Sequence, residues 1–287
     1  MGLEDFAHRF LRRIALLGSM VGDGARLYGH YMALSIRAQM QYRASFIMLA
    51  VGHFISTGIE FLGIWALFAR FGNLKGWTLP EVALFYGIVN VSFALAEGAM
   101  RGFDTFDSLI RSGDFDRLLL RPRSIALQMA GRELQLMRIG RFFQGLLVLG
   151  WGAATLGIPW TATRLAICFG AILGGAFVFA GLFVLQATLC FWTVESIEIV
   201  NTTTYGGVET AQFPLTIYRD WFRRFFTYIV PLAGVTYFPI LAILGRHDPL
   251  GTSRLFQALA PLVGPLFFAV TLQIWHFGVR HYHSTGS

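Results

Sequence analysis

Residues 45–69 read SFIMLAVGHFISTGIEFLGIWALFA, an apolar segment that ends at Arg70. As an α-helix with a rise of about 1.5 Å per residue, this segment is long enough to cross a hydrocarbon core about 30 Å thick. Its ionisable residues are His53 and Glu60. We therefore predict that residues 45–69 form a transmembrane helix and that the rest of the fold is built from similar helices.

The composition of the whole chain favours a protein that crosses the membrane several times. Of its 287 residues, 55% are hydrophobic and only 14% are charged, whereas about 25% are charged in ordinary soluble domains. A single soluble core has too few positions to bury so many apolar side chains. The net charge of +7 comes from arginines between apolar segments, which is typical of membrane orientation rather than of a nucleic-acid surface. We predict an all-α, multi-pass membrane protein that binds no nucleic acid.

Hydropathy and charge divide the chain into six spans within one transmembrane domain. Residues 1–44 are predicted to be cytoplasmic, with a loosely amphipathic helix around residues 9–21 and an interfacial helix over about residues 25–43. The predicted spans cover residues 45–69, 81–100, 142–158, 165–193, 195–217 and 256–279.

The orientation of these spans follows from the arginines and lysines, which are disfavoured on the outer side of the membrane. Six precede the first span and eight lie in the loop over residues 101–141, whereas the loops after the first and third spans hold two and one. The N-terminus and the 101–141 loop are therefore predicted to be cytoplasmic. With an even number of spans the C-terminus is cytoplasmic too.

The segment over residues 194–250 has two interpretations. In the first, residues 195–224 stay in the cytoplasm and residues 225–244 form the fifth span, which keeps Arg223 and Arg224 inside. In the second, residues 195–217 form a polar fifth span and residues 218–248 form a re-entrant pair of short helices on the outer side, because closely spaced prolines interrupt a simple spanning helix. Hydropathy alone does not separate them.

The cytoplasmic loop carries a short predicted helix with two different faces, which Gly113 ends. Its apolar edge consists of Phe103, Phe106 and Ile110. The charged residues on its other faces are Asp104, Asp107 and Arg111. The apolar edge would be exposed in the cytoplasm unless a partner or the lipid headgroups covered it, so we predict that this helix docks into a partner.

Charged residues also follow this helix. Asp116, Arg117 and Arg121 flank an apolar turn over residues 118–120, which Pro122 ends. These residues either belong to the same docking surface or serve only as topogenic charges beside lipid headgroups.

A polar face runs along the predicted fifth span. Its members recur at three or four residues and are Glu195, Glu198, Thr202, Tyr205 and Glu209. Because carboxylates are costly in hydrocarbon, this face is predicted to line a subunit interface or a translocation path, together with Glu60 in the first span. A cytoplasmic helix with a solvated face is the alternative. Glu97 near the inner end of the second span is a further isolated carboxylate.

The chain has no motif for catalysis of its own. It contains neither a GxxxxGK[ST] phosphate loop nor an HExxH or GxSxG motif, and its Cys168 and Cys190 have no metal-like spacing. We predict a non-catalytic chain without a cofactor or metal of its own. A secondary transporter or channel that uses Glu60, Glu195, Glu198 and Glu209 is an alternative, although no inverted repeat is visible.

The order of these features resembles a known family. The string GDFDRLLLRP occupies residues 113–122, and FPL at residues 213–215 is followed by Trp221 and Pro231. An interfacial helix before the first span and a cytoplasmic helix after the second complete the pattern. In these respects the chain resembles the permease subunits of ABC type-2 exporters, in particular bacterial members of similar length.

The resemblance implies an ATP-driven exporter of the bacterial inner membrane. It implies six spans, a second permease that is identical or paralogous, and a separate ATPase that binds ATP and Mg²⁺. It also implies that the helix around Phe103 to Arg111 is the coupling helix and that residues 218–248 form the outer re-entrant pair. The residues that it assigns to ATPase coupling are Phe103, Asp104, Phe106, Asp107, Ile110, Arg111, Asp116, Arg117 and Arg121. The cargo does not follow from it.

Overall fold

The computed structural model describes residues 22–24, 26–193, 197–248 and 251–282, with only the backbone described for residues 197–201. Within this part of the chain the fold is all-helical, with 81% helix and no strands. The prediction of an all-α fold is therefore confirmed. The amphipathic helix predicted around residues 9–21 lies outside the described residues.

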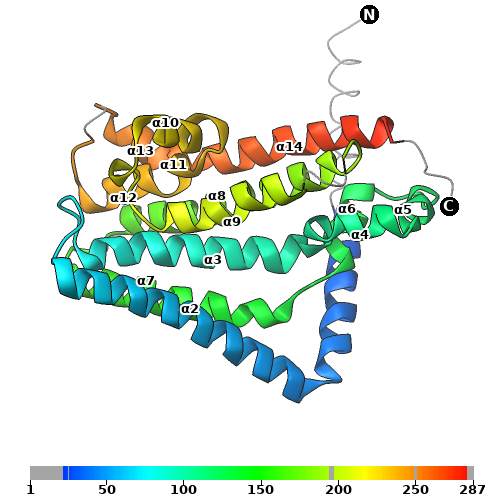
Figure 1. The fold of residues 1–287 in the computed structure, drawn as a ribbon, viewed down its shortest axis with the longest axis horizontal. Helices are drawn as coiled ribbons and strands as arrows, with labels where there is room; N and C mark the ends of the chain where they lie inside the picture. Colours follow the sequence, from blue (N-terminus) through cyan, green and yellow to red (C-terminus); the bar gives the residue numbers. More distant parts are fainter. Residues whose placement is uncertain (1–21, 25, 194–196, 249–250, 283–287) are drawn as a thin grey trace, which may run out of the picture.

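The long helices lie side by side, and most short helices gather at the two ends of this bundle (Figure 1). In chain order the longer helices are α2 (Arg43–Phe71), α3 (Leu79–Asp104), α7 (Ile139–Thr155), α8 (Ala162–Leu189), α9 (Ile197–Ala211) and α14 (Val263–Arg280). A further helix over residues 26–40, dark blue in Figure 1, runs across the direction of the others. We call it the crossing helix.

One end of the bundle, which we call the α4–α6 end, is built from the predicted cytoplasmic loop (Figure 1). Its short elements are α4 (Phe106–Arg111), α5 (Asp114–Leu119), α6 (Ile125–Arg132) and η1 (Leu136–Arg138). The short elements that follow α9 are η3 (Leu215–Ile217), α10 (Asp220–Arg224), the π-helix η4 (Phe225–Ile229), α11 (Leu232–Val235), α12 (Tyr237–Leu244), α13 (Arg254–Leu259) and η5 (Ala260–Leu262).

Four helical stretches in the described residues are long and apolar enough to cross a membrane. They cover Arg43–Phe71, Leu79–Arg111, Ala162–Leu189 and Arg254–Arg280, and a fifth is added if the bent pair Asp220–Ile229 and Leu232–Leu244 is taken as one span. These four stretches overlap the predicted spans at 45–69, 81–100, 165–193 and 256–279, and their length and apolar composition agree with that prediction. Helices α7 and α9, with 17 and 15 residues, lie in the two other predicted spans and are shorter.

Helix α3 is the centre of the packing. It begins with a capping box, in which the Thr78 backbone N–H and hydroxyl both donate to Glu81 Oε2 at 2.8 and 2.9 Å. Its side chains from Glu81 to Ala94 are buried because α7, α8 and α9 pack against it. Helix α2, in contrast, buries only Thr57, Ile64 and Phe68, so most of its surface faces away from the rest of the chain.

Small residues set the distance between α8 and α14. A Cβ atom added to Gly264 would lie 2.1 Å from the Gly174 carbonyl oxygen, and one added to Gly174 would lie 2.5 Å from the Pro261 carbonyl oxygen. The backbones of the two helices are therefore in direct contact. Such close approach is how helices gain packing energy where lipid supplies no hydrophobic driving force.

The segment after α9 lies at the end of the bundle opposite to the α4–α6 end. Lys75 Nζ donates to the Ile217 carbonyl at 3.3 Å, and Trp77 Nε1 donates to Thr216 Oγ1 at 3.1 Å. Both lysine and tryptophan belong to the loop between α2 and α3 (Figure 1). The two members of the bent pair meet at 75°, which agrees with a backbone interrupted by proline.

The predicted helix over residues 103–111 is divided in two. Helix α3 continues to Asp104, and α4 begins at Phe106. Gly113 then adopts a φ of 71°, in the left-handed region that favours glycine, and separates α4 from α5. The predicted end at Gly113 is confirmed, and the predicted start is wrong because α3 extends farther than its apolar segment.

Candidate functional site

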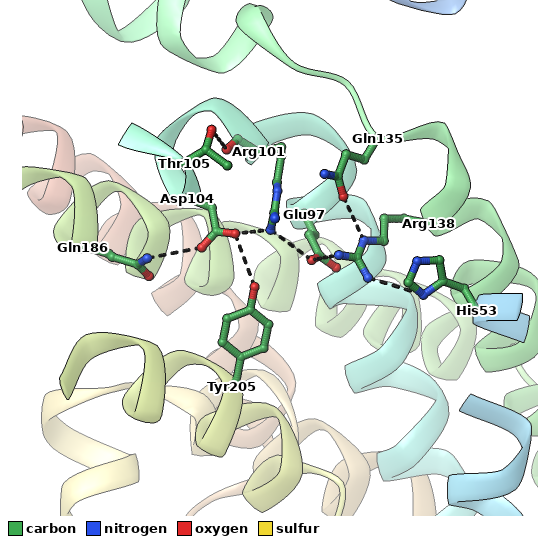
Figure 2. Close-up of polar contacts among 9 residues, drawn as sticks. All are labelled: His53, Glu97, Arg101, Asp104, Thr105, Gln135, Arg138, Gln186 and Tyr205. Carbon is green, nitrogen blue, oxygen red and sulfur yellow. Dashed lines mark hydrogen bonds and ion pairs between the residues drawn. The ribbon is translucent and has the colours of Figure 1, made fainter. Parts of the chain in front are cut away.

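A charged network is buried at the α4–α6 end of α3 (Figure 2). The Glu97 side chain is fully buried, and its Oε1 accepts from Arg138 Nη2 at 2.5 Å and from Arg101 Nη1 at 3.5 Å. Arg101 lies one turn after Glu97 on α3, whereas Arg138 is in η1, where the chain returns toward α7. Two guanidinium groups therefore compensate one buried carboxylate, which would be costly to bury alone.

Asp104 extends this network to two other helices. Its carboxylate pairs with Arg101 and accepts hydrogen bonds from Gln186 Nε2 of α8 and from the Tyr205 hydroxyl of α9, both at 3.2 Å. Figure 2 shows Asp104 between these side chains. The last residue of α3 is thus connected to α8 and α9 immediately before α4 begins.

Arg138 extends the network toward α2. Its Nη1 lies 3.4 Å from His53 Nδ1, and its Nε donates to Gln135 Oε1 at 3.1 Å. Burial lowers the pKa of the Arg138 guanidinium, and the Glu97 carboxylate opposes this change, but an arginine keeps its charge at neutral pH. The network therefore joins α2, α3, α8 and α9 through charged or polar side chains.

The network is not fully satisfied. Within the described residues Glu97 Oε2, Arg101 Nε and Gln186 Oε1 are buried and have no hydrogen-bond partner. Most buried polar atoms in proteins do have one. These three atoms are therefore polar groups of the network that the described side chains leave unsatisfied.

The predicted apolar edge of the cytoplasmic helix is buried within the chain itself. Phe103 and Phe106 are 1% and 0% exposed, and Ile110 is also buried. Phe106 packs edge-on against Phe115 and Trp275, with ring centroids 5.1 Å apart in both pairs. The expectation that this edge is exposed until a partner covers it is wrong, because helical periodicity indicates that a face is covered and does not reveal what covers it.

The charged residues predicted for the same surface are more accessible. Arg111 is exposed on α4, and Asp107 beside it is partly exposed. Asp116 is partly exposed on α5. Arg117 and Arg121 are exposed and line a cleft against the crossing helix. Asp104, in contrast, belongs to the buried network described above.

A second polar group lies farther along the helices. Glu60 on α2 and Glu209 on α9 are exposed, and they are close enough to interact electrostatically with each other and with Arg141 on α7. Arg141 Nε donates to Asn90 Oδ1 of α3 at 2.8 Å, and its guanidinium lies 4.8 Å from the centre of the Phe93 ring. Two carboxylates and one arginine on α2, α9 and α7 therefore lie near one another.

The predicted polar face of α9 is its exposed face. Thr202, Tyr205 and Glu209 are exposed, whereas Thr204 and Val208 of the same helix are buried. These three residues therefore share an exposed face, and its role in a subunit interface or a translocation path stays a prediction. Glu195 lies outside the described residues, as does the side chain of Glu198.

Sequence reasoning did not find the partners of these groups. The spacing of Glu97 and Arg101 by four residues was a visible signal for one ion pair. Arg138 and Gln186 carry no such signal, because their contacts with Glu97 and Asp104 join segments that are distant in the sequence.

Comparison with known proteins places the chain in a family. A family model described as ABC-2 family transporter protein matches residues 54–286. A search of curated proteins and a search of solved structures each found no significant match. The match includes α3 to α14, with both polar groups described above. The chain therefore belongs to the ABC-2 family of transporter membrane proteins.

Proposed function

We propose that this chain is the permease subunit of an ATP-driven exporter in the bacterial inner membrane. It works with a second permease, identical or paralogous, and with a separate ATPase subunit that binds ATP and Mg²⁺. The partner ATPase switches the pair of permeases between inward and outward access. Membership of the family supports a transporter membrane subunit. The polar network between the α4–α6 end and α9 is the observation that carries the rest of the proposal.

The proposed topology has six spans. They are α2, α3, α7, α8, α9 and the stretch from α13 to α14, and residues 218–248 form a re-entrant segment on the outer side. The contacts of Ile217 and Arg246 with the loop between α2 and α3 support this arrangement, because that loop holds few basic residues. Asp220→Cys and His247→Cys, both at exposed positions, should each react with an impermeant thiol reagent outside whole cells. Reaction at position 247 alone would favour the interpretation in which residues 195–224, including α10, stay in the cytoplasm.

The proposed coupling path runs through Asp104. This residue lies next to α4, which the ATPase contacts, and it is bonded to Gln186 and to Tyr205. A displacement of α4 therefore reaches α9 through one ionic side chain rather than through lipid or water. The unsatisfied atoms of Glu97, Arg101 and Gln186 support a second arrangement of the same network.

The proposed cargo path follows the exposed face of α9 and the facing part of α2. Glu60 and Glu209 supply negative charge there, and Thr202 and Tyr205 supply hydroxyl groups. Carboxylates at this depth are costly unless they face water or a partner. A cationic or polyhydroxylated cargo suits these groups best.

The docking of the ATPase tests this proposal. We propose the accessible side of α4, with Asp107, Ser108 and Arg111, as the docking surface. The double variant Asp107→Arg with Arg111→Glu should reduce the amount of co-purified ATPase about tenfold or more, because charges of the wrong sign oppose a charged interface. Arg254→Glu at the far end of the molecule is the matched control and should retain the ATPase.

Two results would contradict the proposal. One is full retention of the ATPase by the double variant at normal membrane levels. The other is ATP hydrolysis by the purified chain after every co-purifying ATPase has been removed, since the chain has no phosphate loop.

A further inference from the structure

A cleft of about 460 Å³ lies at the α4–α6 end of the bundle, between the crossing helix, α5 and α6. Three arginines line it: Arg117, Arg121 and Arg132. One carboxylate, that of Asp114, lines it as well. The ATP-driven mechanism proposed above assigns no role to this cleft.

The charge of the lining favours an anionic ligand. Asp114 Oδ1 accepts from Arg117 Nη1 at 3.2 Å, which accounts for the one carboxylate. In the part of the chain that the structure describes, Arg121 and Arg132 form no ion pair. Guanidinium groups bind phosphate through two parallel hydrogen bonds, so two such groups in one cleft suit a phosphate ligand.

The cleft also contains an uncharged polar group that lacks a partner. Gln128 of α6 lines the cleft and is only 4% exposed. Its Nε2 donates to the Arg123 carbonyl at 3.2 Å, but its Oε1 is buried and has no hydrogen-bond partner within the described residues. This amide oxygen can accept a hydrogen bond from a ligand hydroxyl, an observation independent of the arginines.

The walls of the cleft are partly apolar. Leu34 of the crossing helix and Leu118 of α5 belong to the lining, and Leu34 is 61% exposed. A small soluble anion gains no binding energy from an exposed leucine beside the arginines. An amphiphile gains from both, because its head can bind the arginines while its chain lies along Leu34.

The crossing helix holds the cleft at the membrane boundary. Tyr28 donates from its hydroxyl to the Ala99 carbonyl at 2.9 Å, and burial raises the pKa of this hydroxyl, so it remains a neutral donor. Gln39 Oε1 accepts from the Leu136 backbone N–H at 3.2 Å. The helix runs across the direction of the long helices (Figure 1), and this orientation is the one that interfacial helices take in the plane of lipid headgroups.

We propose that this cleft binds the headgroup of an anionic phospholipid. The phosphate contacts Arg121 and Arg132, a headgroup hydroxyl donates to Gln128, and the acyl chains extend along Leu34. The orientation proposed above assigns this lipid to the cytoplasmic leaflet, where basic pockets between helices bind anionic headgroups. Phosphatidylglycerol offers all three features.

The test compares two pairs of arginines at the same end of the molecule. The full chain, purified in detergent, is titrated with fluorescent phosphatidylglycerol and with fluorescent phosphatidylcholine. The cleft variant is Arg121→Gln with Arg132→Gln, and the control is Arg123→Gln with Arg280→Gln, two exposed arginines that remove the same charge outside the lining. We expect the wild type and the control to prefer phosphatidylglycerol, and the cleft variant to bind it about tenfold more weakly or worse.

Four results would overturn this proposal. Equal binding of the two lipids by the wild type removes the headgroup preference. Equal losses in both variants leave only non-specific charge attraction. Displacement of the lipid by millimolar inorganic phosphate identifies a free anion as the ligand. A cleft variant that binds lipid normally but loses the ATPase also overturns the lipid proposal and assigns the cleft to protein docking. A cleft variant that loses lipid binding but retains the ATPase supports the lipid proposal, independently of the proposed exporter mechanism.

Discussion

Two kinds of carboxylate occur in the apolar helices of this protein, and their surroundings are opposite. Glu97 is fully buried and pairs with Arg138 and Arg101 inside one chain. Glu60 and Glu209 are exposed on α2 and α9. In the described part of the chain neither forms an ion pair.

This difference in burial distinguishes a carboxylate that holds helices together from carboxylates that we propose to act in transport. A buried carboxylate that already has two guanidinium partners stabilises the arrangement of the helices around it. An exposed carboxylate has no such role. Where it lies at membrane depth, its cost is offset by water, by a nearby cation such as Arg141, by a second subunit or by a cargo. Glu97 therefore belongs to the buried charged network, whereas Glu60 and Glu209 are the carboxylates that we propose for the cargo path.

The largest difference is expected in stability. Glu97→Ala leaves Arg138 and Arg101 without their shared partner and should cost about 3 to 5 kcal/mol, the size found when one member of a buried pair is removed. Glu60→Ala should cost much less. Unfolding in detergent, followed by circular dichroism, compares the two variants. Equal losses of unfolding free energy in Glu97→Ala and Glu60→Ala would contradict the distinction between buried and exposed carboxylates.

A smaller loss of stability is expected for the hydrogen bond that joins Tyr205, on the exposed face of α9, to Asp104 in the buried charged network. Tyr205→Phe removes one hydrogen bond to Asp104, which keeps Arg101 and Gln186, so we expect a cost of about 1.5 kcal/mol. The same variant should weaken the response of α9 to ATP, although the ATPase remains bound. Phe222→Tyr, which adds a hydroxyl outside the buried charged network, is a control for effects of mutation and purification that do not involve this hydrogen bond. A full ATP response in Tyr205→Phe would exclude this hydroxyl as the connection.

The end of the bundle opposite to the α4–α6 end provides an intermediate case of an ion pair. Arg246 Nη2 lies 2.8 Å from Glu81 Oε1, and its guanidinium stacks 4.4 Å from the Trp77 ring centre, but the arginine side chain is 36% exposed. Solvent screens such a pair, so Arg246→Gln should cost only about 1 kcal/mol. Thermal unfolding in detergent measures this. A loss as large as that of Glu97→Ala would mean that burial does not control the strength of these pairs.

The smallest effect on stability is expected for Glu60 and Glu209, the two carboxylates of the proposed cargo path. Glu60→Gln together with Glu209→Gln keeps the shape of both side chains and should change stability by less than about 0.5 kcal/mol. Assembly with the ATPase should be unchanged. Export, measured in cells once a cargo is identified, should be lost or strongly reduced. Normal export by this double variant would show that transport needs neither carboxylate.

The spans could be predicted closely from the sequence, because lipid imposes length and hydropathy on each helix. The first predicted span, 45–69, differs from α2 (Arg43–Phe71) by two residues at each end. The predicted end of the fifth segment at residue 217 was less accurate, since α9 ends at Ala211. Pro214 explains this, because the residue before a proline is disfavoured in a helix.

The site was harder to predict because its parts meet only in three dimensions. The exposed face of α9 followed from its spacing, and Thr202, Tyr205 and Glu209 do share it. The pairing of Glu97 with Arg138 depends on the course of the chain from α6 through η1 to α7. The apolar edge of Phe103 and Phe106 was assigned to a partner, although Trp275 near the C-terminus covers it.

One measurement tests the central claim, that ATP in a partner subunit controls access to the face of α9. The variant Glu209→Cys, together with its ATPase, is labelled with an impermeant thiol reagent in right-side-out and inside-out vesicles, with and without ATP and vanadate. Cys168 and Cys190 are buried, so they contribute little background labelling. We expect that trapping the nucleotide moves the reactivity of position 209 from one side of the membrane to the other. Labelling that does not respond to ATP on either side would contradict it.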